Sequence, residues 1–172
     1  MIGRGTRCQL ICAGLLAFAA APALARDSLG MFEAWGAFRD APGQSAEPRC
    51  YAIAKAMPSQ MQRDYQPYAD VAIWPRRGVR GQIHFRLSRR LASGGKIVLT
   101  IGEQRFELTG GGGDAWAVDR RMEAGIVAAM RSAQSMTVSA RDAAGRGFSN
   151  TWPLAGAATA MDAAAIGCAG VR

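Results

Sequence analysis

The sequence predicts a mainly β fold: an antiparallel β-sandwich with one long helix and a short C-terminal helix. At least seven short segments alternate apolar with polar residues, and turns containing glycine and proline separate them. This is the pattern of half-buried strands in a sandwich. The chain shows no strand–helix–strand alternation of the kind that builds a parallel sheet. Only one long segment repeats apolar residues at the three-to-four spacing of a helix.

Residues 1–25 have the three parts of a signal peptide. Arg4 and Arg7 supply the positive start, residues 10–21 the apolar segment, and Ala23-Leu24-Ala25 the small-residue cleavage signal. An uncleaved membrane anchor is the alternative, but the apolar run is shorter than the roughly 20 residues that a spanning helix needs. We therefore expect cleavage after Ala25 and a single exported β-rich domain over residues 26–172, in the periplasm or secreted, without a transmembrane anchor.

The first half of the exported chain is expected to hold strands and two irregular loops. Strand patterns occupy residues 32–39, 50–56 and 71–74, whereas residues 40–49 and 57–70 are polar and contain prolines. The next strand lies in the basic segment 76–90. There Ile83, Phe85 and Leu87 alternate with polar residues, so one face of this strand is buried.

The second half is expected to hold two hairpins and both helices. Residues 96–101 and 104–109 form one hairpin, and the glycines at 110–113 a flexible turn. Residues 119–133 form the long helix, with Asp119 as its N-cap. Strands over residues 135–141 and 148–154 form the second hairpin. The alanine-rich residues 157–166 form the short helix, with Gly167 as its C-cap.

Two cysteines remain after signal cleavage, because Cys8 and Cys12 leave with the signal peptide. In an oxidising compartment, a pair of cysteines favours a disulfide, so we expect a bond between Cys50 and Cys168. A reactive thiol or a metal site is the alternative. Either would need a C-x-x-C motif or neighbouring histidines, and the sequence has neither.

The basic segment contains the candidate binding residues. The net charge falls from +8 to +6 when Arg4 and Arg7 are removed with the signal, so the exported chain remains basic. We expect an anion-binding site made of Arg76, Arg77, Arg80 and Arg86. The alternative is that these arginines are solvated or paired with Asp70, Glu103 or Glu107. Anionic envelope or host-surface molecules are the expected partners, and export makes nucleic acid an unlikely one.

His84 is the only histidine, and it lies on the polar face of the basic strand. No catalytic constellation, metal-ligand spacing or phosphate-binding loop occurs, so we expect no catalytic residues, no metal and no cofactor. A non-enzymatic exported protein is the leading interpretation. The rival is a small periplasmic enzyme that uses His84, and this requires a carboxylate partner from elsewhere in the chain.

Several segments carry a resemblance to a known family. These are the strand pair 96–109, the glycine-rich loop, the helix with Ile126-Val127-Ala128-Ala129-Met130, the strand at Ser135-Met136-Thr137-Val138, and the C-terminal run 152–162. Together with Trp35 and Arg49-Cys50-Tyr51 they resemble the invasion associated locus B family over about residues 30 to 168. The resemblance implies an exported bacterial β-rich domain with a role in the envelope or in host-cell association. It supplies no catalytic residues, and the segment 57–70 and the doubled arginines have no counterpart in it.

Overall fold

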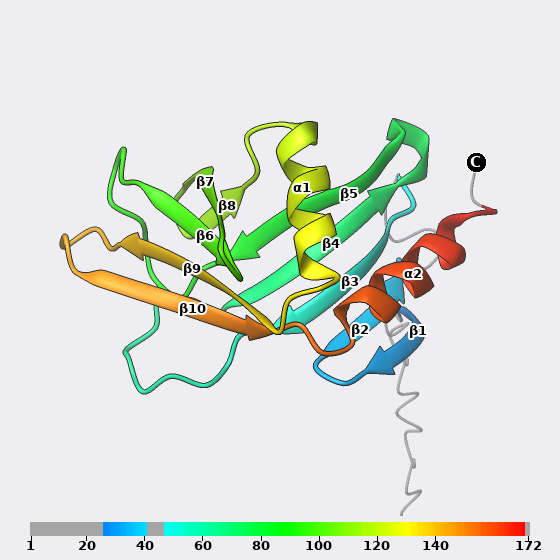
Figure 1. The fold of residues 1–172 in the computed structure, drawn as a ribbon, viewed down its shortest axis with the longest axis horizontal. Helices are drawn as coiled ribbons and strands as arrows, with labels where there is room; N and C mark the ends of the chain where they lie inside the picture. The colour runs from blue at the N-terminus through cyan, green and yellow to red at the C-terminus, as the bar shows by residue number, and fades with distance from the viewer. Residues whose placement is uncertain (1–25, 41–46, 171–172) are drawn as a thin grey trace, which may run out of the picture.

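The computed structural model describes residues 26–40 and 47–170 (Figure 1). The expected signal peptide, residues 1–25, lies outside the described residues. Within the described ranges, no helix is both long enough and apolar enough to cross a bilayer.

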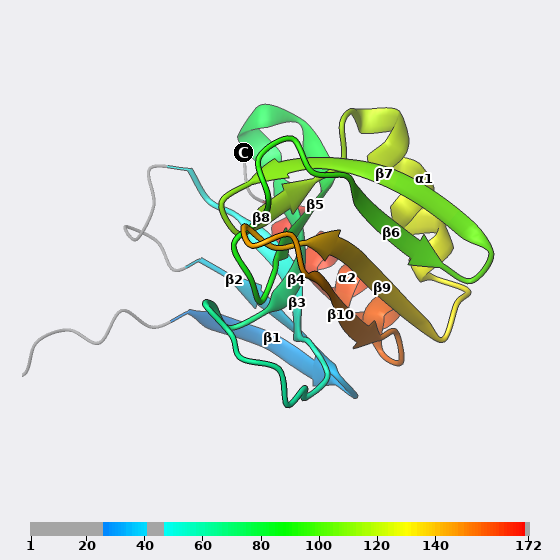
Figure 2. The same ribbon diagram turned by 90° about the vertical axis from the view of Figure 1, so that its left-hand side faces the viewer.

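The described residues form one antiparallel sheet of ten strands, which confirms the mainly β class. The strands are β1 Asp27–Phe32, β2 Trp35–Arg39, β3 Cys50–Lys55, β4 Tyr68–Trp74, β5 Val79–Arg86, β6 Ile97–Ile101, β7 Gln104–Gly111, β8 Asp114–Trp116, β9 Ser135–Arg141 and β10 Gly147–Pro153. Their order across the sheet is β1-β2-β3-β4-β5-β8-β7-β6-β9-β10. The edge strand β1 and the β6–β7 hairpin lie at opposite ends of the molecule (Figures 1 and 2).

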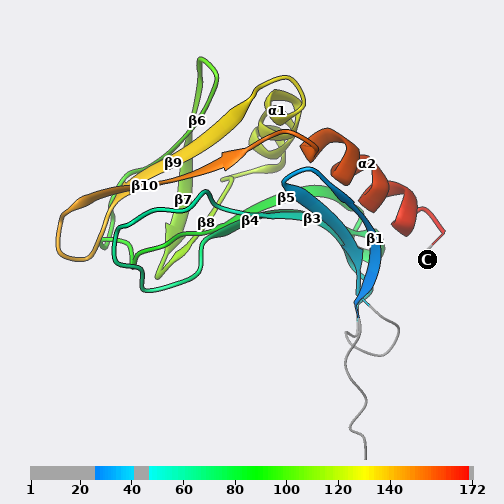
Figure 3. The ribbon, with the colours of Figure 1, turned by 90° about the horizontal axis from the view of Figure 1, so that it is seen from below.

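The two layers of the expected sandwich are joined through β7. The first part of β7 pairs with β6, from Gln104 to Leu108, and its end pairs with β8, from Thr109 to Gly111. The ladder is therefore continuous, and the sheet folds over so that β9 and β10 lie above β4 and β5 (Figure 3). Gly110 lies at this crossing, where a Cβ would be 2.2 Å from the carbonyl oxygen of Asp114. Only glycine fits there.

The core lies between these two layers. Phe85 on β5 and Trp152 on β10 are fully buried, and their ring centroids are 5.4 Å apart. Close by, the Asn150 side chain accepts a hydrogen bond from the Ser88 backbone N–H at 2.9 Å and donates one to the Ser88 hydroxyl at 3.0 Å. These paired polar groups link the layers at a buried position, where an unmade hydrogen bond would be costly.

Helix α1, Arg120–Met130, begins where the sequence predicts. The Asp119 carboxylate accepts a hydrogen bond from the Met122 backbone N–H at 2.7 Å, which satisfies one of the free donors of the first turn. Ile126 and Met130 point into the core, while Val127 packs near Gly81 of β5. This helix thereby covers the start of β5 (Figure 1).

Helix α2, Ala157–Cys168, is as long as α1, so the C-terminal helix is not the short one that was expected. The prediction that Gly167 caps it is wrong, because Gly167 lies inside the helix. At this position a Cβ would be 2.4 Å from Cδ1 of Leu29 on β1. Glycine here serves close packing of α2 against β1 rather than helix termination.

The N-terminal strands also differ from the prediction. The segment 32–39 is not one strand: it holds the end of β1, a tight turn at Glu33 and Ala34, and all of β2, with Glu33 at φ 50°. Its apolar alternation does not reveal the reversal, because a non-glycine residue at positive φ leaves no strong sequence signal. Trp35 Nε1 then donates a hydrogen bond to the Pro153 carbonyl oxygen at 2.8 Å, tying β2 to the end of β10.

Two further strands extend beyond the predicted segments. β4 begins at Tyr68, inside the segment expected to be a loop, and β8 follows the glycine cluster. The glycines at 110–113 are therefore divided between the end of β7 and the turn into β8. These additions matter for the site, since β4 and β8 flank the basic strand β5.

Candidate functional site

The polar face of β4, β5 and β8 gathers the titratable side chains. The antiparallel register places Asp70 opposite His84, and His84 opposite Trp116. Directly paired residues project from the same face of a sheet. The three strands therefore bring an acid, an imidazole and an aromatic ring together from segments that are far apart in the chain.

His84 is held by two carboxylates. Its Nδ1 lies 2.8 Å from Oδ2 of Asp70, and its Nε2 lies 3.1 Å from Oδ1 of Asp114. The ring also stacks on Trp116, with centroids 5.2 Å apart, and meets the edge of Tyr68 at 5.6 Å. Ionised carboxylates only accept hydrogen bonds, so this arrangement suits an imidazolium that donates from both nitrogens.

The pKa of His84 responds to this setting. Burial lowers the pKa, but the hydrogen bonds and negative charges of Asp70 and Asp114 outweigh it and raise the pKa above its ordinary value. Neither ring nitrogen is left to accept a proton from a substrate. The arrangement therefore favours a charged structural histidine over a general base.

Arg86 lies in the same cluster and is paired. Its guanidinium donates to Oδ2 of Asp114 at 2.5 Å and lies over the Tyr65 ring at 3.8 Å from the centroid. Asp114 therefore bridges His84 and Arg86. With His84 protonated, these two cations balance Asp70 and Asp114, so the cluster offers no excess positive charge to a ligand.

The arginines at the start of the basic segment do not gather in one site but lie in different surroundings. Arg77 forms an ion pair with Glu47 and lies over the Trp74 ring, 4.8 Å from the centroid. Arg76 is exposed in the short 3-10 helix Pro75–Arg77. For Arg77 and Arg86 the paired carboxylates are Glu47 and Asp114. Of the carboxylates named in the alternative, Asp70 contacts His84 and Glu107 pairs with Lys96.

Arg80 lies instead beside helix α1. A groove of about 480 Å³ is lined by Arg80 and Val79 from β5 and by Arg120, Ala124 and Val127 from α1. Arg80 and Arg120 are exposed, and neither forms an ion pair with a carboxylate in the described part of the chain. Arg120 was not singled out from the sequence, because it lies on a separate helix and no local motif links it to Arg80.

Glu123 also lines this groove. Burial raises the pKa of its carboxyl group, while the charge of Arg120 opposes that effect. Arg131 lines the far part of the groove and is paired with Asp162 of α2 at 2.7 Å. The groove therefore combines an apolar floor with one carboxyl group, Glu123, and with two cations, Arg80 and Arg120, that form no direct ion pair among the described residues.

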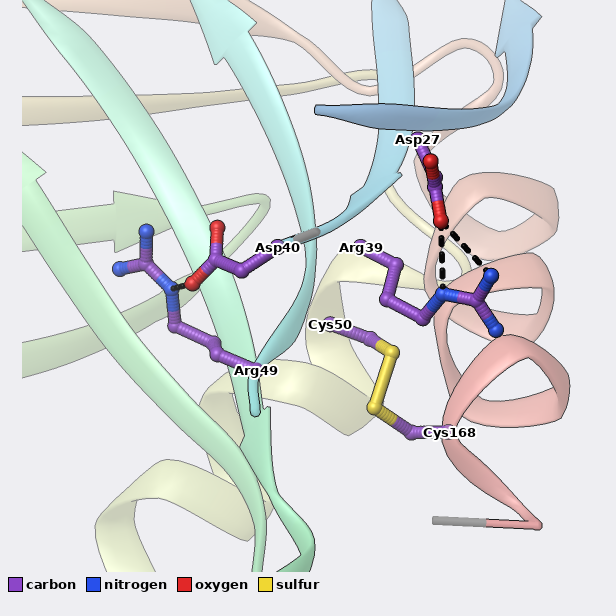
Figure 4. The surroundings of a disulfide bond; sticks show 6 residues. All are labelled: Asp27, Arg39, Asp40, Arg49, Cys50 and Cys168. Atoms are coloured by element: carbon purple, nitrogen blue, oxygen red, sulfur yellow. Dashed lines mark hydrogen bonds and ion pairs between the residues drawn. A yellow bond between two sulfur atoms is a disulfide. The ribbon is translucent and has the colours of Figure 1, made fainter. Parts of the chain in front are cut away.

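The two cysteines meet where the end of α2 packs on the sheet, and Cys168 lines a hollow together with Val79 and Arg80 at the start of β5. Cys50 on β3 and Cys168 on α2 are joined, with their Cα atoms 5.9 Å apart and 118 residues between them in the chain (Figure 4). Two ion pairs lie nearby: Arg39 with Asp27 at 2.7 Å, and Arg49 with Asp40 at 3.2 Å. Both cysteines are buried, so this bond fixes α2 onto the sheet and presents no reactive sulfur.

No cluster of three or more histidine, cysteine or acidic residues suited to a metal ion occurs among residues 26–40 and 47–170. Comparison of the chain with protein-family models, with curated proteins and with solved structures finds no match. The candidate site consequently stands on its own geometry.

Proposed function

We propose that this chain is an exported, non-enzymatic binding protein of the bacterial envelope or the host-contact surface, similar in role to the invasion associated locus B family. Its partners are anionic surface molecules, and its site is the groove between β5 and α1. One observation carries the proposal: Arg80 and Arg120 line one groove, without an ion pair to any described carboxylate.

The chemistry of the groove defines the ligand class. Two guanidinium groups can bind phosphate or carboxylate oxygens through paired N–H donors. Beside them, Val79, Ala124 and Val127 form an apolar surface that can cover the first part of a hydrocarbon chain. Anionic lipids and phosphorylated glycolipids of bacterial or host surfaces have both features. A positive groove also raises the local concentration of anionic ligands.

The geometry of His84 supports a non-enzymatic role. A general base needs an accessible nitrogen within hydrogen-bond reach of the substrate. Here Asp70 occupies one ring nitrogen and Asp114 the other. An enzyme working through His84 would have to break one of these contacts in each turnover.

Vesicle co-sedimentation tests the proposal. The purified protein is mixed with phosphatidylglycerol vesicles and with phosphatidylcholine vesicles, at about 0.01 M and about 0.15 M salt, where the Debye length falls from about 30 Å to about 8 Å. We expect binding to the anionic vesicles alone, and weaker binding at the higher salt. Equal binding to both vesicles, or binding that does not change with salt, would overturn the proposal.

A further inference from the structure

A second hollow lies on the other side of the molecule, over β1, β2 and β3. Its volume is about 730 Å³, and its walls come from the strands and from the segment between β3 and β4. The residues that line it are Met31, Ala34, Gly36, Phe38, Ile53, Ala54, Lys55, Ala56, Pro58, Arg63, Gln66, Pro67 and Tyr68. Pockets of 300 to 1,000 Å³ are about the size that binds small ligands.

The sheet register explains why this hollow is open. Met31 pairs with Gly36, and Gly36 with Ile53, so their side chains share one face. Cys50 belongs to the opposite face of β3, because side chains alternate along a strand and Cys50 is bonded to α2. Helix α2 therefore covers one face of these strands and leaves the other uncovered (Figure 3).

Gly36 allows apolar side chains to form the floor. A Cβ at this position would lie 2.7 Å from the Phe38 ring and 2.8 Å from the Met31 sulfur. With glycine, both side chains extend across the strand. Met31 remains 67% exposed, which is a large apolar exposure for a side chain at the edge of a cavity.

The charged side chains that line the hollow are all positive. Lys55 and Arg63 line it, and no aspartate or glutamate does. Arg63 donates a hydrogen bond to the Ser59 carbonyl oxygen at 3.1 Å, which leaves its positive charge unbalanced, and neither cation forms an ion pair with a described carboxylate. An apolar floor beside two cations complements a ligand that has a hydrocarbon chain and a negative head group.

We propose that this hollow binds a single-chain fatty acid. The chain lies on Met31, Phe38 and Ile53, and the carboxylate contacts Lys55 and Arg63. A carboxylate forms charge-assisted hydrogen bonds with such cations, and each buried methylene adds apolar contact. This site is separate from the groove of Arg80 and Arg120 and does not depend on it.

Calorimetric titration with dodecanoate, below the concentration at which it forms micelles, tests this inference. We expect saturable binding of one dodecanoate, and binding at least about tenfold weaker for dodecyltrimethylammonium, which has the same chain and a positive head. The double variant Lys55→Glu/Arg63→Glu should bind dodecanoate at least about tenfold more weakly. Ala34→Trp, at the exposed rim, should weaken binding by narrowing the hollow without changing its charge.

Two control variants test whether dodecanoate binding depends on the hollow itself. Lys96→Glu/Arg105→Glu changes the net charge equally on the distant β6–β7 hairpin and should leave the dissociation constant within about twofold. Because the groove of Arg80 and Arg120 also combines cations with an apolar floor, the titration is repeated in an Arg80→Gln/Arg120→Gln background, which removes that groove as a second site. In that background the binding of one dodecanoate should persist and should still be weakened by Lys55→Glu/Arg63→Glu, so failure here is separable from failure of vesicle binding. Equal affinity for the two head groups, an unaffected Lys55/Arg63 variant with native circular dichroism, or no dodecanoate binding would each overturn the inference.

Discussion

His84 on β5 and Asp70 on β4 are joined by a contact of 2.8 Å between Nδ1 and Oδ2, and both side chains are largely buried. Their strands pair in register at these two residues. Asp114 approaches the other ring nitrogen from β8, so the imidazole links three adjacent strands. This linkage depends on the protonation of one residue.

The stability of the fold should therefore depend on pH. The folded-state pKa of His84 is raised above its ordinary value of 6.5, so the stabilisation is fully present below pH 6.5. It is lost as the pH rises through the raised pKa, because the unfolded chain releases the proton earlier. Urea unfolding across this range should show the free energy of unfolding falling with rising pH. His84→Gln should remove that component of the pH dependence.

The titration itself can be followed directly, since His84 is the only histidine of the chain. The imidazole proton signal in an NMR titration should report a pKa above 6.5. Asp114→Asn should shift it downward, because an amide replaces one of the two negative charges. A wild-type pKa at or below 6.5 would show that the carboxylates do not hold the imidazolium.

If the protein is exported as proposed, the cysteine pair should be fully oxidised. Protein recovered from the periplasm should take up no alkylating label at Cys50 or Cys168 until it is reduced, as read by mass spectrometry. A bond across 118 residues should stabilise the fold by roughly 4 to 5 kcal/mol on the chain-entropy account. Cys50→Ala/Cys168→Ala should lose about that much in urea unfolding. Labelling of both residues without reduction would rule the bond out.

The substitution Gly167→Ala should change the stability of the fold in opposite directions in the wild type and in a Leu29→Ala background. In the wild type, Gly167→Ala places a Cβ against Leu29, and overpacking should cost about 1 kcal/mol net of the gain in helix propensity. In a Leu29→Ala background the clash is absent, so the same change should stabilise by about 0.5 to 1 kcal/mol. A urea-unfolding cycle of the four proteins measures the coupling. Equal effects in both backgrounds would mean that Leu29 does not restrict this position.

The sequence predicts the strands that alternate cleanly and the helix with a cap, since these depend on local spacing. It does not reveal the β1–β2 turn at Glu33, where tertiary contacts impose a positive φ. It identifies His84 as the only histidine, on the polar face of its strand, but not its partners, because Asp70 and Asp114 lie 14 and 30 residues away. Likewise Arg80 is apparent from the basic segment, whereas Arg120 joins it only through the packing of α1 on β5.

The sharpest test of the proposed function compares two double variants on phosphatidylglycerol vesicles at low salt. Arg80→Gln/Arg120→Gln removes both cations of the groove, and Lys96→Gln/Arg105→Gln removes the same charge from the β6–β7 hairpin. A basic residue near an anionic surface contributes about 1 kcal/mol, so the groove variant should bind about thirtyfold more weakly than the wild type. The hairpin variant should stay within about threefold. Equal losses in the two variants would mean that net charge alone drives binding, and no loss in either would contradict the groove as the site.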